Sequence, residues 1–452
     1  MLLPFSFDRQ KRPFPYALWA LVTFFSQHAI ALLVLAARGA SIAPLTIDCR
    51  FFLMPLQMLA RHAWPSNATL ILSFAYLLIV ASVLAALSFQ RAVDADVSAW
   101  FAAFAVAPVV QLPVILILSV IPSRRVVRVT QQSSNIGASG MATAAQGLAA
   151  GVGLTVFAVA VGALVFGAYG FGIFVVSPFM IGVTTGYFAN RIADVGRFGT
   201  TKLVLGALLL GGIALVLVAL EGVVCLVLAA PLAIATALIG GLLGRAIAVN
   251  AKHPPGHALC GLALLPLVFT AERLLPAAIS FETQSTIMVA APPEALWDVL
   301  MRTDLAEEPV ALPFRLGVAY PLRGEMLGEG VGAIRIGEFS TGTVLEQVTE
   351  WIPNRQLTFI MLTELPAMRE LSPYAHVHAP HVTGYFRTTN TSFGLVSLTS
   401  GHTEIIECTS HELRFGPVLY WLPLARWIVD QNNARVLAHI KRQAEKRVAP
   451  EG

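Results

Sequence analysis

The stretch Thr-Gln-Ser-Thr-Ile-Met-Val-Ala-Ala-Pro-Pro-Glu-Ala-Leu-Trp-Asp-Val-Leu, residues 283–300, separates two parts of the chain with different chemistry. Residues 284–289 alternate in polarity and are rich in β-branched side chains, which predicts a strand. Pro292, Pro293 and Glu294 then suit the first turn of a helix, where a missing N–H costs nothing and a carboxylate meets the helix dipole. The stretch therefore predicts a strand that leads directly into a short helix.

The composition around this stretch indicates a membrane protein. The chain is 56% apolar and only 12% charged, whereas soluble domains carry roughly 25% charged residues. We predict a polytopic membrane domain over residues 1–278 and a soluble domain over residues 279–452. The net charge is +4, and most Lys and Arg residues lie beside apolar runs, which favours a role in membrane topology over nucleic-acid binding.

The first part contains apolar runs of the length that crosses a bilayer. Eight transmembrane helices are predicted, at residues 17–37, 68–87, 98–121, 147–169, 173–189, 203–220, 223–244 and 258–275. A ninth candidate, residues 42–60, contains Asp48 and Arg50. The run 17–37 is long enough to span and has no clear cleavage site behind it, so no cleavable signal peptide is expected.

The location of the soluble domain follows from charge and cysteine usage. The positive-inside rule alone mildly favours the outside if the last span crosses the membrane. The four cysteines are scattered without a CxxC pair, so neither a disulfide framework nor a zinc site is indicated. A reduced Cys408 favours a cytoplasmic location for the soluble domain, and so does the usual cytosolic setting of soluble domains of this kind. We expect a protein of the bacterial inner membrane with its C-terminal domain in the cytoplasm.

Polar residues inside the spans raise the possibility of transport. Gln27, His28, Gln111 and Glu221 interrupt apolar runs, and intramembrane polar groups often mark substrate pathways. The structural interpretation is that His28 hydrogen-bonds a neighbouring helix, that Gln111 fills a contact in a proline-kinked part of the bundle and that Glu221 occupies an exterior turn. No repeated pair of Gly/Pro-broken half-helices marks a midplane site, which weighs against a transporter.

Two motifs of the first part resemble a known family. A basic start at residues 8–12 and the element Asn-Arg-Ile-Ala-Asp-Val-Gly-Arg at residues 190–197 resemble small bacterial inner-membrane proteins of unknown function that carry Arg-Leu-His-Asp-x-Gly. Ala193 stands here in place of the family's His. An anchor of basic residues and a Gly turn at the membrane interface explain the same residues.

The second part has the pattern of an α+β domain. Runs of period two lie at residues 332–339, 342–351, 356–363, 382–389, 391–399 and 403–413, and they predict an antiparallel sheet of six or seven strands. Residues 417–446 then carry an apolar stripe at helical spacing, which predicts a long amphipathic helix. A curved sheet wrapped around its last helix would bury that stripe.

The order of these elements resembles the SRPBCC superfamily, which includes START-like and polyketide cyclase/dehydrase-like proteins. The resemblance lies in residues 291–297, Ala-Pro-Pro-Glu-Ala-Leu-Trp, residues 350–359, Glu-Trp-Ile-Pro-Asn-Arg-Gln-Leu-Thr-Phe, and residues 417–421, Pro-Val-Leu-Tyr-Trp. It covers roughly residues 280–446. It implies a helix-grip fold that encloses a deep apolar cavity, but the fold does not select a reaction.

Several residues are candidates to line such a cavity. Arg335 and Glu338 lie on opposite faces of one strand, so they cannot both point inward. Asn433 lies on the otherwise apolar stripe of the last helix and needs a partner. The predicted ligand-binding residues are Arg335, Phe339, Tyr374, His378, Tyr385, Trp421, Val429, Asn433 and Leu437.

Metal and cofactor chemistry is not indicated. His376, His378 and His381 lie close in sequence but without an accompanying carboxylate or Cys, so residues 364–381 are interpreted as a solvated, proline-stiffened lid. No metal site and no cofactor is expected. Phosphate loops, HExxH helices and nucleophile signatures are missing from the sequence, and no spacing forces two acid–base groups together.

These observations lead to three hypotheses. The first is a membrane-anchored START-like module, whose partners are the bilayer and a lipid or other hydrophobic small molecule, with no nucleic acid. The second is a cyclase/dehydrase-like enzyme acting on such a molecule. The third is a transporter with a sensing domain.

Overall fold

The computed structural model describes residues 12–39, 48–62, 66–105, 108–124, 138–167, 169–250, 264–274, 278–374, 377, 379–398 and 401–448. The chain divides into two compact units. The helical unit comprises Met1–Ala277 with two short segments, Tyr374–His378 and Gly416–Tyr420, and the sheet unit comprises Ala278–Pro373, Ala379–Phe415 and Trp421–Gly452. His378 lies outside the described residues, as do most of residues 1–12 and the start of the predicted span 258–275.

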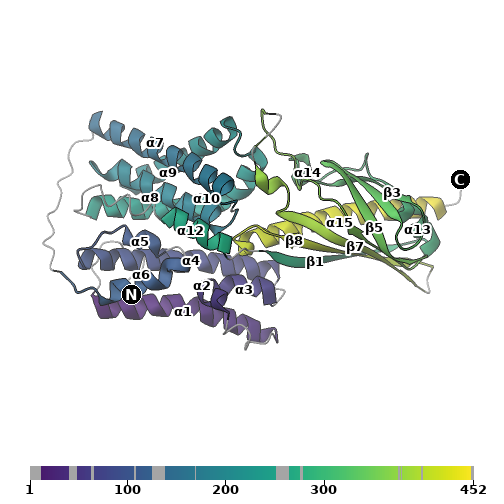
Figure 1. The fold of residues 1–452 in the computed structure, drawn as a ribbon, viewed down its shortest axis with the longest axis horizontal. Coiled ribbons are helices and arrows are strands. Elements are labelled where there is room, and N and C mark those ends of the chain that lie inside the picture. Colours follow the sequence, from purple (N-terminus) through teal and green to yellow (C-terminus); the bar gives the residue numbers. More distant parts are fainter. Residues whose placement is uncertain are drawn as a thin grey trace. The chain divides into compact units, whose positions relative to one another are not determined.

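The helical unit is built from apolar helices (Figure 1). Their bounds are α1 Pro13–Ala37, α2 Cys49–Leu53, α3 Pro55–His62, α4 Asn67–Asp94, α5 Phe101–Phe104, α6 Pro108–Val120, α7 Ala138–Ala160, η2 Val161–Val165, η3 Gly172–Val176, α8 Ser177–Asn190, α9 Gly196–Leu217, α10 Val223–Asn250 and α12 Leu264–Leu274.

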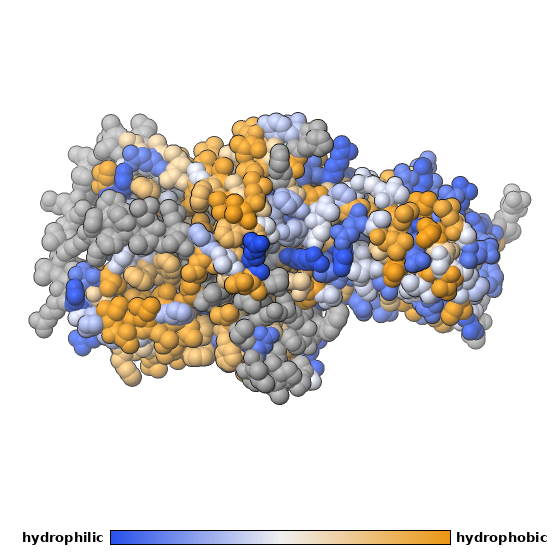
Figure 2. Space-filling view, viewed as in Figure 1, coloured by the Kyte–Doolittle hydropathy of each residue, from blue (hydrophilic) through white to orange (hydrophobic). Residues whose placement is uncertain are grey.

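Six helices among the described residues are long and apolar enough to cross a membrane: Pro13–Ala37, Asn67–Asp94, Ala142–Val165, Gly172–Asn190, Gly196–Leu217 and Val223–Asn250. Apolar side chains cover much of the visible face of this unit (Figure 2), and Leu33, Leu72 and Leu209 are about 70% exposed. The predicted span 98–121 is divided between α5 and the short α6, and residues 42–60 yield only the short helices α2 and α3.

Close packing of α8 against α10 forms the centre of this unit. Nearly all of the α8 span is buried, at 94%. A Cβ on Gly182 or Gly186 would overlap backbone atoms of Ala237 or Gly241, and a Cβ on Gly244 would overlap the carbonyl of Val183. These glycines therefore allow the two backbones to approach as closely as small-residue interfaces in membranes do.

Some polar groups buried in this unit pair with one another. Arg91 lies at the end of α4, is fully buried and pairs with Asp94, and its guanidinium also donates to the backbone carbonyls of Leu118 and Ile121. Gln27 donates to Gln111 at 3.4 Å. The contact of Gln27 with Gln111 agrees with the structural interpretation that Gln111 fills a contact within the bundle.

The sheet unit contains eight antiparallel strands in the order β1-β8-β7-β6-β5-β4-β3-β2. The strands are β1 Ile279–Val289, β2 Arg302–Asp304, β3 Pro321–Leu327, β4 Ile334–Phe339, β5 Gly342–Ile352, β6 Gln356–Met361, β7 Phe386–Ser397 and β8 Thr403–Leu413. Two of them, β2 and β3, were not predicted. The two predicted runs at 382–389 and 391–399 form the single strand β7, because pairing with β8 continues through a bulge at Thr388 and Asn390.

The sheet curls around the long helix α15 Val418–Val448, as Figure 1 shows, and this confirms the predicted fold class. The short helices α13 Pro293–Met301 and α14 Leu312–Arg315 complete the unit, with the 3-10 turn η5 Pro380–Val382. One apolar core joins α13, the inner sheet face and the stripe of α15. It includes Leu296, Trp297, Phe359, Phe393, Ile405, Val436, Leu437 and Ile440.

The opening stretch of the sequence folds as predicted. β1 pairs with β8 over its whole length, Pro292 is the N-cap of α13, and Pro293 is the first residue of this helix. Leu296 and Leu300 are buried on one face of this helix. Trp297 contacts Trp351 edge to face, with ring centroids 5.2 Å apart.

Candidate functional site

The sheet face that turns toward α15 carries a group of buried polar side chains. In β8 every second residue, Thr403, Ile405, Glu407, Thr409, His411 and Leu413, is buried, so these side chains share the inner face. Polar groups from β1, β4, β5 and α15 join them. We call Thr283, Arg335, Glu346, Glu407, Thr409, His411 and Asn433 the inner polar cluster.

An ion pair forms one side of the inner polar cluster. Arg335 in β4 lies directly opposite Glu346 in β5 and donates to its carboxylate. Their side chains are 15% and 1% exposed. The guanidinium also lies over the ring of Phe359, at 4.8 Å from the centroid. The neighbouring strand accommodates this arrangement, because a Cβ on Gly324 would overlap the Arg335 guanidinium.

A second buried acid, Glu407, lies on the same face. It is opposite Phe393 in β7 and is 4% exposed. Its Oε2 has no hydrogen-bond partner among the described residues. Burial raises the pKa of Glu407 to about 8, although the charge of Arg335 opposes this shift. Burial also raises the pKa of Glu346, against the lowering effect of Arg335.

A hydrogen-bonded group of neutral side chains forms the other side of the cluster. The hydroxyls of Thr283 and Thr409 lie 2.7 Å apart, and Asn433 Nδ2 donates to both oxygens at 3.3 Å. His411 Nε2 lies 2.8 Å from the Thr409 hydroxyl. Asn433 therefore has the partners that its place on an apolar stripe required.

His411 is held as a neutral ring. It stacks between Phe281 and Phe386, with centroid distances of 5.1 and 5.4 Å. Burial lowers its pKa to about 3, so it is uncharged at neutral pH. Its Nδ1 lies 3.1 Å from the Thr388 hydroxyl.

The predicted binding residues occupy different places. Arg335 and Asn433 belong to the inner polar cluster, Val429 is buried on the stripe of α15, and Leu437 packs in the apolar core. Phe339 ends β4 and is partly buried. As predicted from the pleat, Glu338 turns outward and pairs with Arg323 at 3.6 Å.

Three aromatic candidates make other contacts. Trp421 and Tyr385 each pack against Phe415, with centroids 5.3 and 5.5 Å apart. Burial raises the pKa of Tyr385. Tyr374 groups with the helical unit, and its hydroxyl donates to the carbonyl oxygen of Leu217.

The loop that was interpreted as a solvated lid is partly packed. His381 is 1% exposed and its Nε2 lies 3.6 Å from Glu370, which is also buried. The amide of Ala367 donates to the carbonyl of Val382, which ties the two ends of the loop together. The interpretation as a solvated loop is therefore wrong at His381, because this backbone pairing and the turn η5 fold it inward.

Glu346 and Glu407 were not predicted from the sequence. Period two does place Glu407 on the same side of β8 as Ile405 and Leu413, but the opposite side also contains an isoleucine, Ile406. Glu346 could have been predicted as the partner of Arg335 if the pairing of their two strands had been known. The sequence alone does not give this pairing.

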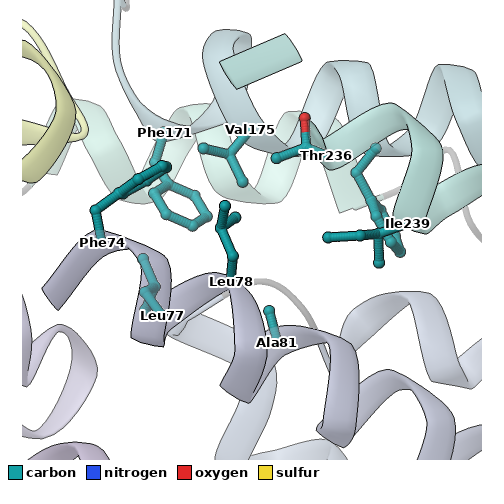
Figure 3. Close-up of a pocket in the computed structure, with 9 residues that line it drawn as sticks. Phe74, Leu77, Leu78, Ala81, Phe171, Val175, Thr236 and Ile239 are labelled. Carbon is teal, nitrogen blue, oxygen red and sulfur yellow. The ribbon is translucent and has the colours of Figure 1, made fainter. Parts of the chain in front are cut away.

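The helical unit has a small pocket of its own (Figure 3). Phe74, Leu77, Leu78 and Ala81 from α4 face Phe171 and Val175 across it, with Thr236 and Ile239 from α10. Its cavity volume is about 10 Å³, roughly the space of one water molecule. Gln111 and Glu221, the candidates for transport, do not line it.

Part of the chain resembles solved structures, although only distantly. An aromatase/cyclase from a Streptomyces species is 17% identical, with a TM-score of 0.27, over 38% of this chain and 99% of that chain. Norcoclaurine synthase from Thalictrum flavum is 16% identical, with a TM-score of 0.23, over 38% of this chain and 87% of that chain. An uncharacterized protein from Rhizobium leguminosarum is 12% identical, with a TM-score of 0.24, over 37% and 98%.

These likenesses are too distant to carry an argument about activity. No family model and no curated protein matches the chain. The functional argument therefore depends on the residues of the inner face.

Proposed function

We propose that the sheet unit is a membrane-anchored module that binds a hydrophobic small molecule between the inner sheet face and α15. One observation carries the proposal: the polar groups of this face lie deep among Phe359, Phe393 and Ile405, and the buried Glu407 Oε2 has no partner among the described residues. A buried carboxyl without a partner is costly. A bound ligand with one polar group would satisfy it.

The apolar helices give this module a reason to be part of a membrane protein. Six helices among the described residues fit a bilayer, and a poorly soluble ligand is concentrated in lipid. Partition from the bilayer would then supply the site. The chemistry supports a ligand that is mostly apolar, because apolar side chains surround the few polar groups.

The test is extraction of bound molecules from the full-length protein. Thr391 is buried on the inner face of β7 opposite Thr409, and its neighbour Ser392 faces the other side of the sheet. The replacement Thr391→Phe would occupy the site, while Ser392→Phe adds the same ring to the outer face as a matched control.

The expected result is a hydrophobic molecule, identified by mass spectrometry, that remains with the wild type and with the Ser392→Phe variant. It should be strongly reduced in the Thr391→Phe variant. Equal amounts in all three proteins, or only bulk membrane lipid in all three, would refute the proposal.

A second candidate is acid-catalysed chemistry on the bound molecule, and the same carboxyl favours it. A group whose pKa is about 8 carries a proton at neutral pH and suits general acid catalysis. Conversion of the extracted molecule by the wild type, and its loss in Glu407→Gln with binding retained, would support an enzyme. Recovery of the molecule unchanged after incubation with the wild type would exclude this second candidate.

A further inference from the structure

The few titratable groups of the inner face also indicate which charge the ligand carries. Those that face Glu407 are Arg335 from β4, Glu346 from β5 and His411 from β8 itself. The positions of β1, β7 and α15 described beside Glu407 hold threonine, serine, asparagine and apolar side chains. Farther along α15, Arg426 lies over the ring of Phe281, which stacks on His411. The charge at this site is therefore set by four side chains.

The charges of these four side chains sum to zero when Glu407 is neutral. Arg335 and Glu346 form an ion pair in which the carboxylate is 1% exposed, and His411 is uncharged between two phenylalanine rings. An ionised Glu407 would add an uncompensated negative charge in an apolar surrounding, which is expensive. A protonated Glu407 adds none.

A protonated carboxyl needs an acceptor. Its O–H is a donor, and Oε2 of Glu407 has no hydrogen-bond partner among the described residues. Its cross-strand neighbours are Phe393 in β7, which offers only a ring, and Ser285 in β1, which does not bond to Oε2. A ligand oxygen is the group that completes this geometry.

We propose that the neutral carboxyl of Glu407 donates a hydrogen bond to a carbonyl or ether oxygen of an uncharged hydrophobic ligand. This inference rests on the function proposed above. It selects against two other ligand classes. Among the described residues, the cation that acts on Glu407 is Arg335, which is already paired with Glu346 and so is not available to an anionic ligand. A cationic ligand would need Glu407 in its ionised form.

The experiment uses the full-length protein in nanodiscs and three matched fluorescent probes, with empty nanodiscs as background. Prodan is uncharged and has a ketone. 2-(Dimethylamino)-6-propylnaphthalene lacks the ketone, and its N-trimethylammonium derivative is a cation. Saturable binding to the wild type, to Glu407→Gln and to Glu407→Met gives the dissociation constants.

The wild type should bind prodan about tenfold more tightly than the probe without the ketone, since one net hydrogen bond in an apolar site has that effect. Glu407→Gln should keep this preference, because its amide still donates, and Glu407→Met should lose it. In the wild type the preference should also disappear as the pH rises above about 8, whereas it should persist in Glu407→Gln.

Three results would overturn the inference alone. They are saturable binding without any preference for the ketone, a preference that survives in Glu407→Met, and tightest binding of the cation that is lost in Glu407→Gln. Absence of saturable binding for all three probes would refute the proposed function itself, and the inference with it. Should Glu407→Met fail to fold, the pH dependence of the wild type against Glu407→Gln decides the matter.

Discussion

Replacing Arg335 with methionine tests the physical core of the site. The change removes the only cation that faces two buried acids among the described residues of the inner face, Glu346 and Glu407. Removing one partner of a buried ion pair costs about 3–5 kcal/mol, because the other charge is left uncompensated. Since Glu346 is 1% exposed, solvent screening does not reduce this cost.

The assay is hydrogen exchange of the full-length protein in nanodiscs, followed by mass spectrometry of peptides from β4, β5 and β6. A local stability loss of about 3–5 kcal/mol corresponds to exchange that is about 150- to 5,000-fold faster. The variant Arg335→Met/Glu346→Gln should recover much of the protection, because the uncompensated carboxylate is gone. Unchanged exchange in Arg335→Met would refute the reasoning.

A double-mutant cycle with Gly324 gives this prediction a second, steric test. Alanine at position 324 would place its Cβ on the Arg335 guanidinium, so Gly324→Ala should cost about 1–3 kcal/mol in the wild type. Methionine at position 335 is more flexible and removes the overlap. The cost of Gly324→Ala should then fall substantially in the Arg335→Met background, and equal costs in the two backgrounds would show that the two side chains are not in contact.

Three further predictions concern other parts of the chain. Glu407 has a pKa of about 8 in the folded protein, so between pH 6.5 and 8 the folded protein keeps a proton that the unfolded chain has released. The free energy of unfolding should therefore fall by about 2 kcal/mol as the pH rises over this range. Hydrogen exchange of β8, corrected for intrinsic rates, should show this loss in the wild type and not in Glu407→Gln. Asn433→Leu removes the donor to the hydroxyls of Thr283 and Thr409 and should lower the free energy of unfolding by about 1–3 kcal/mol, measured as faster hydrogen exchange in β1 and β8. This loss of stability should be smaller in the Thr283→Val/Thr409→Val background. An equal loss in that background would contradict the hydrogen-bonded arrangement. In the helical unit, the new Cβ of Gly182→Ala would overlap the carbonyl of Ala237, whereas that of Gly153→Ala meets nothing within 4 Å. Gly182→Ala should therefore lower the melting temperature in detergent by several degrees, and Gly153→Ala should not. Equal effects of the two variants would argue against the close packing of α8 and α10.

Much of the sheet unit was predictable because its signals are local. The strand-to-helix junction at residues 283–300 and the apolar stripe of α15 depend on neighbouring residues, and both formed as expected. β2 was not predicted because it has only three residues, and β3 was not predicted because it contains Pro321 and Gly324. Asn390 separates the two predicted runs 382–389 and 391–399, but pairing on both sides of β7 holds it within one strand.

The inner polar cluster depended on information that the sequence does not contain. Which of two faces of β8 turns inward is decided by packing against α15, and Ile405 and Ile406 make the two faces similar in apolar content. The contact of Arg335 with Glu346 depends on strand register. In contrast, the need of Asn433 for a partner followed from its position on the helix, and its partners are threonines on β1 and β8.

The most direct test of the central claim is photoaffinity mapping of the full-length protein in nanodiscs with a long-chain alkyl ketone that carries a diazirine. Glu407 and Cys408 are neighbours in β8, with Glu407 buried on the inner face and Cys408 exposed on the outer face. Adducts should map to Thr391, Phe393 and Glu407, should be absent from Cys408, and should disappear when excess unlabelled ketone competes. Adducts confined to the helical unit, or labelling of Cys408 equal to that of Glu407, would contradict a binding site on the inner face.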